Sequence, residues 1–153
     1  MRISVDGIQR QVKRFQNIKR RVQSFRMFFE QVAKPLLIEE VETIFAREGI
    51  APRWRPLALS TLIEKREAGL DNGILRRTGK LYRAYTDGSG ARVSDTRFSY
   101  TVDVPYARFH EFGTARIPQR QVFGQVIRNK TYQRNLITQA RAYIRRGVRE
   151  AGR

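Results

Sequence analysis

Apolar residues recur at spacings of three and four along the first third of the chain, which is the period of an α-helix. Basic residues occupy the opposite side of this stretch, so the pattern predicts a basic N-terminal helix over about residues 6–48. Because proline has no amide hydrogen and clashes with the preceding helical turn, Pro35 should either kink this helix or divide it into two. The inward-facing residues are Ile8, Val12, Phe15, Ile18, Val22, Phe25, Phe29, Val32, Leu36, Leu37, Val41, Ile44 and Phe45.

The hydrophobic period changes to two where polar residues alternate with Phe98, Tyr100, Val102 and Val104. This alternation is typical of a half-buried strand. Turn-forming residues at 94–96 separate it from a shorter apolar stretch at about 91–93, so we predict an antiparallel hairpin. Residues 121–123 are a candidate third strand.

Helical spacing returns near the C-terminus and predicts a basic helix over about residues 131–150. Two short helices are expected before it. One begins at Ser60 or Thr61, because Thr61 and Glu64 have the spacing of a capping box, and the other begins at Thr78. The C-terminal helix has an apolar face made of Tyr132, Leu136, Ala140, Tyr143, Ile144 and Val148.

The order of these elements predicts an α+β fold. In this fold the long N-terminal helix and the C-terminal helix pack on a small antiparallel sheet, with short helices and a long loop between them. A chain of 153 residues has the length of one domain, so residues 1–153 are expected to share a single core. Trp54, the only tryptophan, is either a core anchor or an interface hot spot, and its position beside Pro56 and Leu57 favours the core.

The long loop spans residues 105–124 and holds aromatic, basic and turn-forming residues. Pro105 should end the preceding strand, after which Tyr106, Phe109 and His110 share one face of a short helical turn. Gly113 is suited to stop that turn, and Pro118 then forces an extended path. The loop also carries Arg116 and Arg120, which we expect in solvent or against a partner.

The formal net charge is +17, which suggests an anionic partner. Most of it lies at the two ends. Residues 1–30 hold eight basic and two acidic side chains, and residues 126–153 hold eight basic and one acidic. In the middle, four residues form either a phosphate-binding patch or, as we favour, a solvated charged face: Arg76, Arg77, Lys80 and Arg83.

Several kinds of chemistry are disfavoured by the sequence. It has no cysteine and one histidine, so disulfides are excluded and a zinc site would depend mainly on carboxylates. No nucleotide-binding or metalloprotease motif is present, and no nucleophile has a useful spacing from His110 and Glu111. No apolar run reaches the roughly 20 residues of a membrane span, and the N-terminus lacks the apolar core of a secretory signal. We therefore expect a soluble, unprocessed protein that is not an enzyme and has no cofactor, metal site or membrane contact.

Three blocks of the sequence, taken in order, form a pattern of aromatic, turn-forming and basic residues. The first is Trp54-Arg-Pro-Leu-Ala-Leu-Ser-Thr-Leu followed by Lys65, and the second is Ile74-Leu-Arg-Arg-Thr-Gly-Lys-Leu. The third is Tyr106-Ala-Arg-Phe-His-Glu-Phe-Gly-Thr, followed by Pro118-Gln-Arg and Phe123-Gly. In this order the three blocks resemble the virion morphogenesis and tail-completion proteins of long-tailed bacteriophages, and together they cover about residues 54–124. Gln119 departs from the family pattern, which often has a small residue there.

The resemblance implies a structural virion protein that completes the tail and joins it to the head at the neck of the phage. It implies a ring of copies of the chain, made before particle release in the host cytoplasm. The partners would be tail-terminator or tail-tube proteins, head-completion or connector proteins, and DNA in the channel through non-specific charge attraction. The candidate interface residues are Tyr106, Phe109, His110, Glu111, Phe112, Gly113, Arg116, Arg120 and Trp54.

A second hypothesis follows from charge alone, and it is a basic module that binds nucleic acid without sequence specificity. Against it, the basic residues lie opposite apolar helical stripes, and no helix-turn-helix or RNA-binding signature is present.

Overall fold

The structure is a computed structural model that describes residues 24–150. It confirms the predicted α+β class, with several helices, a small antiparallel sheet and a long C-terminal helix. The predicted N-terminal helix before residue 24 lies outside the described residues. In chain order the elements are α2 (Arg26–Phe28), η1 (Phe29–Ala33), α3 (Lys34–Ala46), α4 (Leu59–Glu67), α5 (Lys80–Thr86), β1 (Ala91–Val93), β2 (Phe98–Tyr100), α6 (Ala107–Phe112), α7 (Phe123–Arg128) and α8 (Lys130–Glu150).

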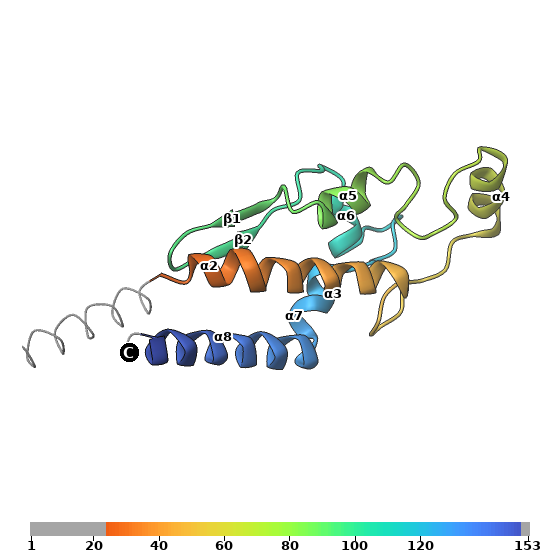
Figure 1. Ribbon diagram of the computed structural model, residues 1–153. Coiled ribbons are helices and arrows are strands. Elements are labelled where there is room, and N and C mark those ends of the chain that lie inside the picture. The colour runs from red at the N-terminus through yellow and green to blue at the C-terminus, as the bar shows by residue number, and fades with distance from the viewer. Residues whose placement is uncertain (1–23, 151–153) are drawn as a thin grey trace, which may run out of the picture.

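The helix around Pro35 is not divided. The segments α2, η1 and α3 follow one another without a break, and η1 is a π-helical turn that ends at Ala33, two residues before Pro35 (Figure 1). Pro35 has no amide hydrogen and cannot make the α-helical hydrogen bond to the preceding turn. The wider π-helical turn therefore lies next to a position where that bond is absent. Helix α3 ends at Ala46, earlier than predicted, because Glu48 and Gly49 both adopt positive φ.

The hydrophobic core is built along α3. Val41 and Ile44 are completely buried, and Phe45 lies at the centre of an aromatic cluster. Its ring meets Trp54 edge-on with a centroid distance of 5.5 Å and Tyr82 at 5.1 Å. Other elements complete the core through Leu37, Ile74, Leu81, Tyr85, Val104, Ala107, Val122 and Val126. The inward positions predicted for α3 are therefore confirmed, except that Leu36 is only half-buried.

Helix α3 lies between two layers (Figure 1). The hairpin, α5 and α6 lie on one side of it, and α7 and α8 lie on the other, with α8 antiparallel to α3. At the start of α8, Asn129 Nδ2 donates to Glu40 at 2.6 Å. Further along, the Tyr143 ring lies 5.6 Å from that of Phe28. Helix α8 begins at Lys130, one residue before the predicted start, and the Asn129 side chain accepts bonds from the amides of its first turn.

The predicted hairpin is confirmed, with Ala91 opposite Tyr100 and Val93 opposite Phe98, but β2 ends at Tyr100, so the predicted strand does not continue to Val102 and Val104. The candidate third strand at residues 121–123 is wrong, and within the described residues the sheet has two strands. Phe123 instead begins α7. The reason is a tertiary contact: the Glu111 carboxylate accepts hydrogen bonds from the amides at this helix start, so these amides are not available for a strand ladder.

The predicted capping box of α4 is also wrong. Helix α4 begins at Leu59, so Ser60 and Thr61 lie inside it, and the helix start has no side-chain cap. Glu64 instead accepts a hydrogen bond from Arg77 at 2.7 Å. Helix α5 begins at Lys80, two residues after Thr78, because Gly79 occupies the cap position at φ 69°. Helix α4 projects at one end of the molecule, away from the two layers (Figure 1).

Candidate functional site

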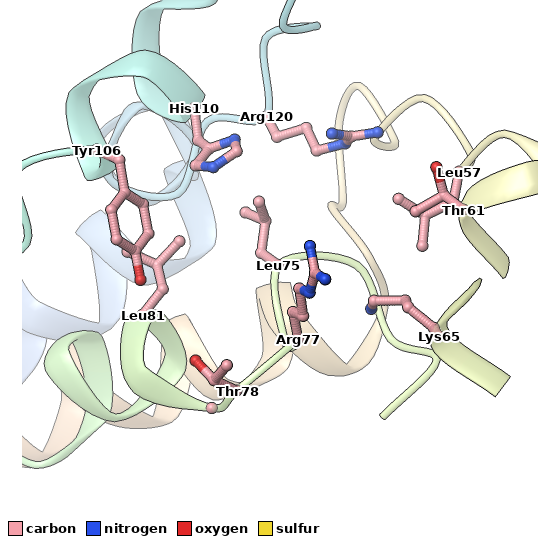
Figure 2. Close-up of a pocket in the computed structure, with 11 residues that line it drawn as sticks. Leu57, Thr61, Lys65, Leu75, Arg77, Thr78, Leu81, Tyr106, His110 and Arg120 are labelled. Carbon is pink, nitrogen blue, oxygen red and sulfur yellow. The ribbon is translucent and has the colours of Figure 1, made fainter. Parts of the chain in front are cut away.

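A cavity of about 390 Å³ lies between α4, the segment that leads into α5, and the stretch from α6 to Arg120. Figure 2 shows His110 and Arg120 along one side of it and Lys65 and Arg77 on the opposite side. Its lining residues are Leu57, Thr61, Lys65, Leu75, Arg77, Thr78, Gly79, Leu81, Tyr106, His110 and Arg120.

All three sequence blocks contribute to this cavity, although they are far apart along the chain. The first block gives Leu57, Thr61 and Lys65. The second gives Leu75, Arg77, Thr78, Gly79 and Leu81, and the third gives Tyr106, His110 and Arg120. The predicted site residues Tyr106, His110 and Arg120 are thus brought together, and Arg77 from the predicted basic patch joins them. Lys65 was not among the predicted site residues, although the first block includes it, because its burial depends on carbonyls of the following loop that spacing does not reveal.

Lys65 comes from the last turn of α4 and is only 4% exposed. Its ammonium group donates to the backbone carbonyls of Asp71 at 2.7 Å and Gly73 at 2.8 Å. These bonds tie the loop after α4 to the helix. Burial lowers the pKa of Lys65, since the charged form has lost much of its hydration.

Arg120 is 8% exposed, so of the two predicted alternatives, solvent or a partner, the structure contradicts solvent. Its amide donates to the carbonyl of His110 at 2.7 Å, so the chain after Pro118 is held against α6 and the side chain points inward. The guanidinium donates from Nη2 to the carbonyl of Arg55 at 3.1 Å. Burial and the nearby Arg55 charge lower the pKa of Arg120.

His110 is half-buried, and its ring meets the Tyr106 ring edge-on at 6.2 Å. Nδ1 of His110 is buried and has no hydrogen-bond partner among residues 24–150. Burial lowers the pKa of His110, and the charge of Arg120 lowers it further. The imidazole is therefore neutral at neutral pH, and its enclosed Nδ1 is left without a hydrogen bond.

The predicted basic patch does not form one site. Arg77 lies at the cavity and pairs with Glu64 at 2.7 Å, whereas the guanidinium of Arg76 lies over the Tyr82 ring at 4.9 Å. Lys80 and Arg83 line a separate hollow of about 620 Å³. Since Arg77, Lys80 and Arg83 are all exposed, the solvated-face interpretation holds for most of the patch.

Two of the candidate interface residues have internal roles instead. Trp54 is 5% exposed, and its indole Nε1 donates to the carbonyl of Gln121 at 2.9 Å, which confirms the core-anchor interpretation. The Glu111 carboxylate accepts from the amides of Val122 at 2.8 Å and Gly124 at 2.6 Å. The prediction that Trp54 and Glu111 form an external surface is therefore wrong, because both make bonds inside the chain.

Other candidate interface residues do lie outside. Phe112 is 74% exposed, and Phe109 on the same short helix and Tyr106 at its N-cap are also exposed. Arg116 is exposed as well, and Gly113 ends α6 at φ 75° as predicted. We call Tyr106, Phe109 and Phe112 the α6 aromatic patch. Tyr106 also lines the cavity, so the patch lies beside the cavity mouth.

A second hollow of about 700 Å³ continues from the cavity. The two share Leu57, Thr61, His110 and Arg120. The second is bordered in addition by Arg55, Pro56, Ala58, Arg116, Ile117 and Pro118. Neither lining contains an aspartate or a glutamate, so the whole groove is basic and apolar.

Two further kinds of site are not found between residues 24 and 150. No group of three or more His, Cys, Asp or Glu side chains is placed to hold a metal ion there. No helix in this part of the chain is long and apolar enough to cross a membrane. Comparison of the chain with protein-family models, with curated proteins and with solved structures found no match.

Proposed function

We propose that this protein is a structural virion protein of a long-tailed phage, which completes the tail and joins it to the head at the neck. The observation that carries the proposal is the convergence of the three sequence blocks on one cavity. Residues from Leu57 to Arg120 meet there, although the blocks were identified from the sequence alone. A shared motif whose parts line one site is more specific than three unrelated matches along a chain.

The exposed surfaces support assembly into a ring. Ring closure needs two different patches on each subunit, one for each neighbour. The α6 aromatic patch is one candidate. On the other side of α3, α7 and α8 expose Ile127, Ile137, Ile144 and Val148. Two apolar surfaces in opposite layers suit head-to-tail contacts between copies of the chain better than a two-fold dimer.

In this proposal the partners are neighbouring copies, tail-terminator or tail-tube proteins, and head-completion or connector proteins. The protein acts by binding, without a reaction or a cofactor. In the finished virion the protein lies at the neck, and during assembly it lies in the host cytoplasm.

Add-back to phage particles that lack the protein tests the proposal. The purified chain should restore infectivity, and labelled protein should be found at the neck by electron microscopy. Phe112→Ser should fold normally but restore infectivity poorly, because it removes a large exposed apolar contact. Leu59→Ser is the matched control, since Leu59 is 72% exposed on α4, outside the α6 aromatic patch. Absence of the protein from mature virions and from assembly intermediates would refute the proposal.

A second candidate function, non-specific nucleic-acid binding, is favoured by α8. This helix exposes Lys130, Arg134, Arg141, Arg145, Arg146 and Arg149. Binding through these residues should weaken steeply with salt, because each neutralised phosphate releases counterions. Location at the neck separates the two functions, since salt-sensitive DNA binding is compatible with both.

A further inference from the structure

We propose that the groove formed by the two hollows binds an extended segment of a neighbouring protein subunit, with an acidic side chain of that segment seated in the cavity. This inference rests on the proposed function, because the neighbouring subunit is part of the assembly, and it names the chemistry that the neighbour must present.

The first support is buried positive charge without an ion-pair partner. Lys65 and Arg120 are both almost fully buried in the cavity wall, and their hydrogen bonds go to neutral backbone carbonyls. The carboxylates of Asp71 and Glu48 act on Lys65, and that of Glu48 on Arg120, without forming an ion pair. Within residues 24–150, neither forms an ion pair with a carboxylate. Buried charges in proteins are normally paired, because desolvation is costly. A carboxylate in the cavity would pair with Arg120 and lower the electrostatic cost of the Lys65 charge across from it.

The second support is the unused hydrogen-bonding capacity of His110. Its Nδ1 is buried and unpartnered, and its ring lies on the same side of the cavity as Arg120 (Figure 2). Because Nδ1 is enclosed, the bond to a ligand falls to Nε2, which can donate to a carboxylate oxygen that also faces the arginine. Arg77 on the opposite side and the Thr61 hydroxyl provide further donors.

The third support is the apolar part of the lining, which indicates a protein segment rather than a nucleic acid or a free anion. Leu57, Leu75, Leu81 and Tyr106 line the cavity together with the basic groups. A phosphate would leave these side chains in contact with water, whereas an acidic residue with apolar neighbours would cover them. The second hollow, bordered by Ile117 and Pro118, gives an extended chain a path out of the cavity.

The single histidine makes a direct test possible. His110 is the only histidine in the chain, so its ring signals in an NMR spectrum report on the cavity without assignment of other residues. The probe is a blocked peptide of alternating leucine and aspartate, titrated into the full-length protein. We expect a saturable shift of the His110 signals and a rise of the His110 pKa, because a nearby carboxylate favours the charged ring.

Controls separate the carboxylate from the other features of the probe. The same peptide with asparagine in place of aspartate should bind at least about tenfold more weakly, since it lacks the charge-assisted bonds. Arg77→Gln should weaken binding of the acidic peptide by about tenfold, because it removes one exposed cation of the wall. Arg66→Gln is the matched control, because Arg66 is an exposed cation next to Lys65 in α4 but does not line the cavity. This variant should bind the acidic peptide as wild type does.

Three results would overturn the inference: no saturable shift, equal binding of the acidic and neutral peptides, or stronger binding of a thymidine oligonucleotide than of the acidic peptide at the same salt concentration. The test is independent of the particle experiment. If the chain restores infectivity but the peptide does not bind, this inference alone fails. If the peptide binds but the chain is absent from virions, the proposed function fails and the site stands.

Discussion

Replacement of Glu111 tests whether this residue is an internal cap or an interface residue. Its two carboxylate oxygens accept hydrogen bonds from the amides of Val122 at 2.8 Å and Gly124 at 2.6 Å. Val122 is 1% exposed, so in Glu111→Ala its amide loses an acceptor where water has little access. The amide of Gly124 is less buried and can bind water instead.

The two bonds set the expected magnitude. A hydrogen bond to a charged group contributes about 1.5–3 kcal/mol, and an unsatisfied buried amide costs about 1–3 kcal/mol. Because the second amide regains water, we expect Glu111→Ala to lower the free energy of unfolding by about 2–4 kcal/mol. Glu111→Gln keeps one acceptor oxygen but turns an NH2 group toward the other amide. Glu111→Gln should therefore lower the free energy of unfolding by about half as much as Glu111→Ala.

Urea unfolding followed by tryptophan fluorescence measures this loss. Trp54 is the only tryptophan and is buried against Phe45, so its emission reports on the core. Glu67→Ala is the control, because Glu67 is exposed at the end of α4 and should stay within about 0.5 kcal/mol of wild type. If Glu111→Ala also stays within about 0.5 kcal/mol and instead impairs assembly, the capping argument is wrong.

Three further predictions concern pH, the core and a helix cap. The folded-state pKa of His110 lies below its usual value of 6.5, so the unfolded chain takes up the proton first. Stability should therefore fall as the pH drops below about 6.5, by at most about 1.4 kcal/mol per pH unit, and thermal unfolding should show a smaller loss in His110→Gln. Ile44→Ala removes a fully buried side chain and should cost about 2–5 kcal/mol in urea unfolding, whereas Ile63→Ala on exposed α4 should cost less than about 0.5 kcal/mol. Asn129→Ala should lower the free energy of unfolding by about 1 kcal/mol. Asn129→Asp should also be less stable than wild type in the same assay, because it keeps the cap but places a carboxylate against Glu40. An aspartate variant as stable as wild type would show that the bond to Glu40 contributes nothing.

Periodicity predicted the elements whose formation depends on local sequence. The spacing of Tyr132 to Val148 located α8 to within one residue, and the alternation around Phe98 located the hairpin. The errors arose where contacts distant in sequence decide the structure. Residues 121–123 have the composition of a strand, but Glu111 caps a helix there.

The candidate site was predictable in part for the same reason. The loop from Tyr106 to Arg120 was identified from its residues, and its turn of helix and its stop at Gly113 were correct. The inward position of Arg120 depends on the carbonyl of Arg55, which is 65 residues earlier. The burial of Lys65 depends on carbonyls in the following loop. Spacing rules contain no information about such partners.

The position of α4 has a consequence for how the groove is filled. This helix buries a single side chain, Lys65, whereas α3 carries the core. One wall of the cavity therefore belongs to a helix that adds no apolar side chain to the core, and Leu81 on another wall is part of the core. Opening at α4 admits an occupant without loss of the central packing, and an occupant that neutralises Lys65 makes that helix part of the rigid body.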